Sequence, residues 1–174
     1  MGDPEWMHVV SADDGARFVL GTVGEHPFVC VGVNPSTATP ERLDATVTRV
    51  ARRAAALGFD SWVMLNLYPQ RSTDPAGLHE RADAALVADN ERAIADVLRR
   101  RPGALCAAWG TLIGSRPYLA GLARRVIAIA DTAGCSWSAL GNVTAAGHPR
   151  HPLYVRGDAP LVPFDARAYA DQLP

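Results

Sequence analysis

Strand-like runs alternate with helical patterns along most of this chain, and this alternation is what most limits its fold. Apolar side chains at helical spacing predict helices over residues 41–57, 80–100, 115–123 and 164–172. Continuous apolar runs predict strands over residues 16–23, 28–33, 62–67, 104–110 and 125–130. Such an order is typical of an α/β protein, so we expect a three-layer sandwich with a central, mainly parallel four-stranded sheet between helices.

The size and composition of the chain fit one domain. At 174 residues, we expect residues 1–174 to form that single unit. The chain is 48% hydrophobic and 20% charged, which is enough apolar surface for a core. A formal charge of −1 excludes a uniformly basic DNA-coating protein, although a local basic patch remains compatible with it.

The sequence carries no targeting or cofactor signature. The stretch MGDPEWMHVV lacks the basic and apolar regions of a signal peptide, and no apolar run reaches the roughly 18 residues that span a bilayer. Cys30, Cys106 and Cys135 are widely spaced and form no C-x-x-C pair, which argues against a disulfide framework, an iron–sulfur cluster or structural zinc. We therefore expect a cytoplasmic monomer with buried thiols, no membrane partner, no cofactor and no metal ion.

Polar or ring side chains follow the predicted buried strands. They are Asn34, Asn66, Trp109 with Gly110, and the loop from His148 to His151. In an open parallel sheet, ligands bind in the crevice outside the carboxyl ends of the strands. We therefore expect these four segments to converge on one site.

The first of these segments is Asn34-Pro35-Ser36-Thr37. An asparagine amide donates and accepts hydrogen bonds, so Asn34 can hold a water molecule or read the polar edge of a ligand. Pro35 fixes its own φ and keeps Asn34 out of the helical region, which presents the amide rigidly. The alternative is an Asx-type turn in which Ser36 or Thr37 caps the following helix.

Asn66 stands in VMLNLYP, directly after four apolar residues of a strand. Asparagine is a poor strand former, and a buried amide needs hydrogen-bond partners. Its two polar groups can pair with the imide-like edge of a pyrimidine. Alternatively, Asn66 ties down the loop that follows.

The segment GHPRHPLYV places His148 and His151 three residues apart, each before a proline. A histidine can hydrogen-bond a developing anion, and Arg150 can contact a phosphate. Zinc is disfavoured because no carboxylate or cysteine stands at close spacing. A purely structural histidine–proline loop is the alternative.

The remaining charged residues give weaker evidence for a role in the site. Arg71 faces either the cleft or solvent, and Asp44 with Arg49 reads as a surface or helix-to-loop ion pair. The chain contains no G-x-S-x-G, G-x-x-x-x-G-K-[ST] or G-x-G-x-x-G pattern. Serine hydrolase, P-loop and nicotinamide functions therefore have no motif to support them.

Five segments in order resemble a bacterial family catalogued as domain of unknown function 1643: GVNPSTA, DATVTR, VMLNLYPQRSTDP, AAWG and GHPRHPLYV. The resemblance covers residues 28–156, most of the chain, and it does not by itself imply an activity.

A more distant resemblance is to the uracil-DNA glycosylase superfamily. VGVNPS is similar to its G-x-N-P-G turn, VMLN to its strand-end L-L-L-N, AAWG to a later strand end, and HPRHPL to its His-Pro-Ser loop. The resemblance implies that Asn34 orients the attacking water, that Asn66 reads the base, and that His151, or His148 in another register, stabilises the departing base. It further implies substrate contacts, which we expect from Gly32, Pro35, Ser36, Arg71, Trp109, Arg150 and Leu153.

The chain departs from that superfamily in three places. Ser36 replaces the usual glycine, which restricts the approach of a flipped nucleotide. No strand-end aspartate is present, so the resemblance implies a weaker, asparagine-type activity. Leu153 stands where the loop serine would be, and it or Tyr154 is a candidate intercalating wedge.

Two functions follow as hypotheses. The first is a DNA glycosylase that excises uracil or another damaged base from duplex or single-stranded DNA. The second is a protein of the same fold that binds or processes free nucleobases, nucleosides or nucleotides. An arginine-lined groove beside the site favours DNA, whereas a closed pocket favours a small molecule.

Overall fold

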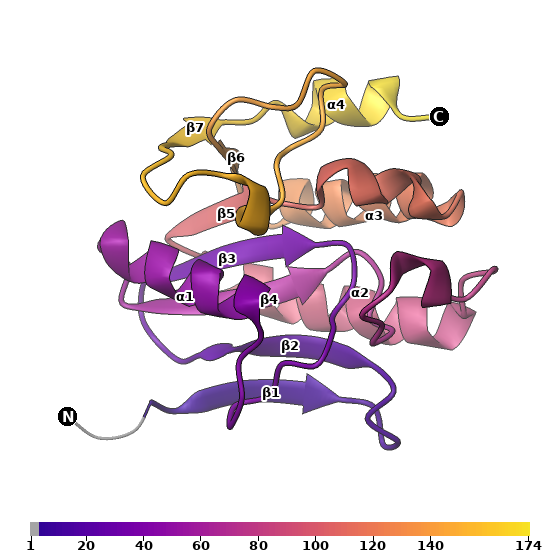
Figure 1. Cartoon of the computed structure of the whole chain (residues 1–174), viewed down its shortest axis with the longest axis horizontal. Coiled ribbons are helices and arrows are strands. Elements are labelled where there is room, and N and C mark those ends of the chain that lie inside the picture. Colours follow the sequence, from indigo (N-terminus) through magenta and orange to yellow (C-terminus); the bar gives the residue numbers. More distant parts are fainter. Residues whose placement is uncertain (1–3) are drawn as a thin grey trace.

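A seven-stranded mixed β-sheet with helices on both faces forms the framework of the protein (Figure 1). The computed structural model describes residues 4–174. The strands are β1 (Trp6–Val10), β2 (Arg17–Thr22), β3 (Pro27–Gly32), β4 (Ser61–Asn66), β5 (Ala104–Ala107), β6 (Trp137–Leu140) and β7 (Leu161–Pro163). The α/β class is confirmed.

The strand order is β1-β2-β4-β3-β5-β6-β7. The middle strands β4, β3, β5 and β6 pair in parallel. On the outside, β2 and β1 continue the sheet in antiparallel fashion next to β4, and β7 pairs antiparallel with β6. The sheet is therefore larger and more mixed than the four-stranded sheet that the sequence predicts, because β1 and β7 are short and only half-buried.

In the part of the chain that the structure describes, four α-helices connect or follow the strands: α1 (Ala45–Ala56), α2 (Ala84–Leu98), α3 (Tyr118–Thr132) and α4 (Ala166–Gln172). Three short 3₁₀ helices, η1 (Pro75–Gly77), η2 (Gly110–Ser115) and η3 (Pro152–Tyr154), lie in the connections. None of the helices within residues 4–174 has the length and apolar character needed to cross a membrane.

The strand predicted over residues 125–130 is wrong, because this segment lies inside α3. Leu119, Leu122, Val126 and Ala130 recur at helical spacing and are buried on one face of that helix. A short apolar run does not distinguish a strand from a buried helix. The true fourth parallel strand is β6, in a segment that reads as a loop because serines flank Trp137.

The core has two parts, one on each face of the sheet. Val47, Val50 and Ala54 of α1 pack against one face together with Phe28 and Cys30. On the other face, α2, α3 and α4 bury a larger cluster that contains Ile94, Leu98, Leu119, Ile127 and Tyr169. Figure 1 shows α1 in front of the sheet and α2 and α3 behind it. Of the three cysteines, Cys30 and Cys106 are buried and Cys135 is half-buried, all as free thiols.

Candidate functional site

A small recess lies at the carboxyl ends of the central strands β3 and β4. Gly32 and Asn66 are in-register partners at the last positions of these strands. Pairing continues beyond them, because the backbone N–H groups of Leu67 and Tyr68 donate to Gly32 and Val33. We call this the polar recess, and it is lined by Arg17, Gly32, Val33, Asn34, Pro35, Ser36, Asp44, Thr46, Val47, Met64, Asn66, Leu112 and His151.

Gly32 allows the two strand ends to pack closely in the recess. A Cβ atom at this position would stand 2.8 Å from Cε of Met64 and 3.0 Å from the carboxamide of Asn66. Contacts of this length force neighbouring atoms to shift. Because Gly32 has no side chain, the amide of Asn66 can occupy its position at the strand end.

The amide of Asn34 is partly committed to the protein. Its Nδ2 donates to the carbonyl oxygens of Pro35 and Ser72, both at 2.9 Å. This arrangement ties the loop after β3 to the loop after β4, in line with the turn-forming alternative. Oδ1 of Asn34 remains available as an acceptor for a water molecule.

Asn66 is almost completely buried, with 1% of its surface exposed. The acceptors around its carboxamide favour the orientation in which Nδ2 donates to the carbonyl oxygens of Asn34 and Leu65, both at 3.3 Å. The backbone carbonyl of Asn66 accepts from Nδ2 of the buried Asn90 at 2.9 Å. Both the strand end and the side chain are thus held in place, as a group that reads a ligand requires.

His151 is the histidine that reaches the recess, and it caps the short helix η3. Its Nδ1 accepts from the backbone N–H of Leu153 at 3.3 Å, so a neutral ring carries its hydrogen on Nε2. Burial lowers the pKa of His151 below its ordinary value of 6.5, and the nearby Asp44 carboxylate opposes this shift. His151 is therefore a neutral hydrogen-bond donor at pH 7.

The turn after β5 fixes the position of the His151 loop. Gly110 has a φ of +60° and donates its N–H to the carbonyl of Pro149 at 2.8 Å. A Cβ on Gly110 would lie only 3.3 Å from Cβ of His151. This close contact holds His151, and not His148, at the recess.

Asp44 and Arg17 also line the recess, although the sequence predicts neither as a site residue. Asp44 is the N-cap of α1: its Oδ1 accepts from the N–H of Val47 at 2.9 Å. The ion pair expected between Asp44 and Arg49 does not form, since Arg49 Nη2 donates to the carbonyl of Val155 instead. The signal for Asp44 was its position three residues before Val47, which fits a helix cap.

Arg17 is 1% exposed at the start of β2. Its Nη1 donates to the carbonyl of Ala38 at 3.0 Å, while Nε has no acceptor within the described residues. Burial, and then the positive charge of Arg71, lower the pKa of Arg17 to about 10. An arginine inside an apolar strand pattern was the sequence signal for this residue, because arginine is seldom fully buried without a partner.

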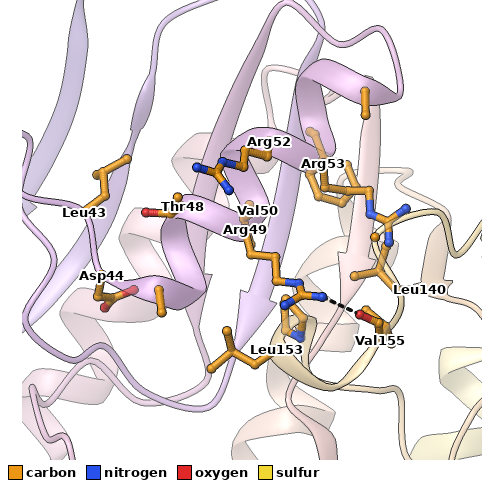
Figure 2. Close-up of a pocket in the computed structure, with 15 residues that line it drawn as sticks. Leu43, Asp44, Thr48, Arg49, Val50, Arg52, Arg53, Leu140, Leu153 and Val155 are labelled. Carbon is orange, nitrogen blue, oxygen red and sulfur yellow. Dashed lines mark hydrogen bonds between the residues drawn. The ribbon is translucent and has the colours of Figure 1, made fainter.

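A larger groove adjoins the recess and shares Asp44 with it. This α1 groove, of about 800 Å³, runs between α1 and the 152–157 segment, and its wall includes Arg49, Arg52, Arg53, Leu153 and Val155 (Figure 2). Figure 2 shows the three arginines along α1 and Leu153 on the opposite side.

Two of the groove arginines hold the opposite wall. Arg53 donates to the carbonyls of Ala159 and Arg156 at 2.6 and 2.7 Å, and Arg49 donates to Val155 at 2.9 Å. Arg52 is exposed and has no hydrogen-bond partner within residues 4–174. The groove therefore offers a positive surface at which Arg52 is the most available cation.

Five predicted site residues do not line the recess, and one of them, Leu153, lines the α1 groove instead. Trp109 is fully buried and donates Nε1 to Tyr169 at 2.9 Å, and His148 is 2.9 Å from the same hydroxyl. Arg150 donates to the carbonyl of Asn142. Arg71 pairs with Asp14 at 3.0 Å and donates to the carbonyls of Ser36 and Ala38, so it braces the recess loop from outside.

The volume of the polar recess, about 60 Å³, limits what it can hold in the free protein. This is about the volume of two liquid water molecules, or of the polar edge of a small ring. Within residues 4–174, no three His, Cys, Asp or Glu side chains are grouped as ligands of a metal ion. The chemistry available in the recess is that of amides, a neutral imidazole, a carboxylate and a guanidinium.

Together these features define an α/β protein with a polar site at the carboxyl ends of its central parallel strands. Residues 17–153 match the family described as "Protein of unknown function (DUF1643)", and the chain therefore belongs to that family. No curated protein and no solved structure matches the chain.

Proposed function

We propose that this protein is a DNA glycosylase of the uracil-DNA glycosylase type, which cleaves the N-glycosidic bond of uracil or another damaged base. The observation that carries the proposal is that Asn34, Asn66 and His151 line one recess, at the end of the arginine-lined α1 groove. The four parallel middle strands support the related fold that the sequence resemblance implies.

The reaction divides among the recess residues as follows. A water molecule that donates a hydrogen bond to Oδ1 of Asn34 attacks C1′ of the nucleotide. The bond from C1′ to the base nitrogen breaks, and its electron pair leaves with the base. One proton of the attacking water passes to the free oxygen of Asp44, and the immediate products are the base anion and an abasic sugar. The base then takes up a proton from solvent, and Asp44 returns its proton to solvent.

His151 acts on the leaving base. Its Nε2–H donates to the oxygen on which negative charge develops, which stabilises the transition state more than the ground state. The lowered pKa of His151 suits this role, because a neutral imidazole remains a donor without adding a buried cation. Asn66 reads the edge of the base through its carboxamide.

The α1 groove holds the DNA strand in this proposal. Arg52 meets phosphate, and Arg49 adds positive charge along the same helix. Tyr154, 77% exposed, and Leu153 stand next to His151 and provide apolar contacts for the bases left behind. The ring of Tyr154 lies 5.6 Å from that of His151, so this contact would lie beside the flipped base.

The small recess favours a second candidate, a protein that binds or processes free nucleobases or nucleotides. A volume of about 60 Å³ admits the edge of a base, and a whole flipped ring requires the lining to move. Damaged-base release from oligonucleotides separates the two. We expect release from oligonucleotides carrying uracil, hypoxanthine or oxidised pyrimidines, in single-stranded or mismatched contexts. Turnover of free nucleosides alone would favour the second candidate.

A further inference from the structure

A fully buried arginine stands in the wall of the polar recess with most of its hydrogen-bonding capacity unused. A guanidinium carries five N–H donors, and only Nη1 of Arg17 has an acceptor within the described residues. Burial of a charged group without partners costs several kcal/mol in general terms. If the residue at this point of β2 had only a structural role, an apolar side chain would be buried at a lower cost in free energy.

The position of Arg17 follows from the antiparallel pairing of β2 with β4. The start of β2 lies at the carboxyl end of β4, and the backbone N–H of Arg17 donates to the carbonyl of Pro69 in the loop after β4. The side chain therefore reaches the same end of the sheet as Asn66. Arg17 belongs to the recess by topology as well as by contact.

The charges around Arg17 leave it as the available cation. Arg71 is paired with Asp14, and His151 is neutral. Asp44 is the nearest negative group in the recess, and one of its oxygens is already bound to the N–H of Val47. Thr46, in the first turn of α1, also lines the recess, so the positive end of that helix dipole faces it.

We propose that the polar recess is an anion-binding site in which Arg17 meets an anionic oxygen of the ligand. If the proposed glycosylase function holds, this oxygen belongs to the departing pyrimidine anion, and Arg17 supplies a fixed positive charge that neutral His151 lacks. The same chemistry fits a phosphate oxygen of a free nucleotide. The site itself does not depend on catalysis.

The test is calorimetric titration of the whole protein with three probes. Barbiturate is a pyrimidine ring that is anionic at neutral pH, uracil is a neutral ring of similar shape, and inorganic phosphate is an oxyanion without a ring. We expect at least one anion to bind with saturation and about tenfold or more tighter than uracil, as charge-assisted hydrogen bonds predict. If barbiturate binds more tightly than phosphate, the anionic oxygen of the ligand belongs to a base. If phosphate binds more tightly, the oxygen belongs to a phosphate group.

Variants locate the binding. Arg17→Lys keeps the charge but loses the planar fork, and we expect anion binding at least about tenfold weaker. Arg17→Met removes the charge and should abolish it. The matched control is Arg92→Met on α2, an exposed arginine paired with Asp89, for which unchanged binding is expected.

A second measurement uses the wild type alone, in case the Arg17 variants do not fold. The assigned Nε–H resonance of Arg17 should shift with saturation during the anion titration, together with the side-chain amides of Asn34 and Asn66. Absence of saturable anion binding, or shifts confined to residues outside the recess, would overturn the proposal. Because no DNA is present, a failed glycosylase screen leaves this outcome unaffected.

Discussion

Gly32 and Asn66 face each other in register at the ends of the parallel strands β3 and β4. The loops that follow therefore start side by side, and Asn34 reaches across to the loop of Ser72. His151 joins them from a third segment, which Gly110 holds through Pro149. Three parts of the chain thus meet in one recess.

Asp44 combines a helix cap with a free carboxylate oxygen, and substitutions can separate these two roles. Asn is as good an N-cap as Asp, so Asp44→Asn should leave the free energy of unfolding nearly unchanged, whereas Asp44→Ala should lower it by about 1 kcal/mol. If Asp44 accepts the proton of water, both variants should excise base about 10²-fold or more slowly. Urea denaturation and single-turnover excision measure the two effects. Full excision by Asp44→Asn would leave the residue as a cap only.

A side chain at Gly32 should destabilise the protein through its contact with Asn66. Gly32→Ala places Cβ 2.8 Å from the flexible end of Met64, which can move, and 3.0 Å from the buried carboxamide of Asn66, so we expect a loss of about 1 kcal/mol in the free energy of unfolding. The matched control is Gly121→Ala within α3, where a Cβ meets no atom within 4 Å. There the helix propensity of alanine should stabilise the protein by up to about 1 kcal/mol. Equal stabilities of the two variants would contradict the close packing of the recess.

His151 should make the protein sensitive to acid. Its pKa is lowered by burial, so the unfolded state binds its proton first as the pH falls through 6.5. The stability present above this pH is lost progressively below it, until the folded protein also binds the proton. His151→Asn, which retains a helix-capping side chain, should show a shallower loss of unfolding free energy between about pH 7 and pH 5. A slope identical to that of the wild type would show that His151 is not protected from protonation.

Arg52 should contribute to DNA binding through charge. Arg52→Ala should weaken binding to single-stranded and duplex DNA alike and reduce the magnitude of the salt-dependence slope by about 0.7–0.9. Arg92→Ala, on α2 and outside the α1 groove, should leave both quantities unchanged. Fluorescence anisotropy over a range of salt concentrations provides the measurement. Equal losses in the two variants would remove the α1 groove as the DNA contact.

The strand ends were predictable from sequence, whereas their neighbours across the sheet were not. Asn34 and Asn66 follow long apolar runs, so a parallel arrangement brings them together by a local rule. Arg17 joins them only because β2 lies antiparallel beside β4, and pairing between distant strands is not visible in a local pattern. The strands β1 and β7 were missed for a different reason, because they are short and only half-buried.

The choice between His148 and His151 likewise depended on a distant contact. Both histidines precede a proline, and the sequence treats them alike. The hydrogen bond from Gly110 to Pro149 sets His151 toward the recess, while His148 lies against Tyr169. Segment 125–130 was misassigned for another reason, since a short apolar run fits a strand and a buried helix equally well.

The central claim is that Asn34 and His151 cleave an N-glycosidic bond, and single-turnover excision from a defined oligonucleotide tests it most directly. Each variant is first shown to be folded by circular dichroism. The wild type should release a damaged base, and Asn34→Ala and His151→Ala should each lower the rate by about 10²-fold or more. Asn66→Asp should also abolish release, because a carboxylate cannot donate to the carbonyl oxygens of Asn34 and Leu65 that hold the side chain in place. No release by the wild type, or wild-type rates in folded Asn34→Ala and His151→Ala, would contradict the claim.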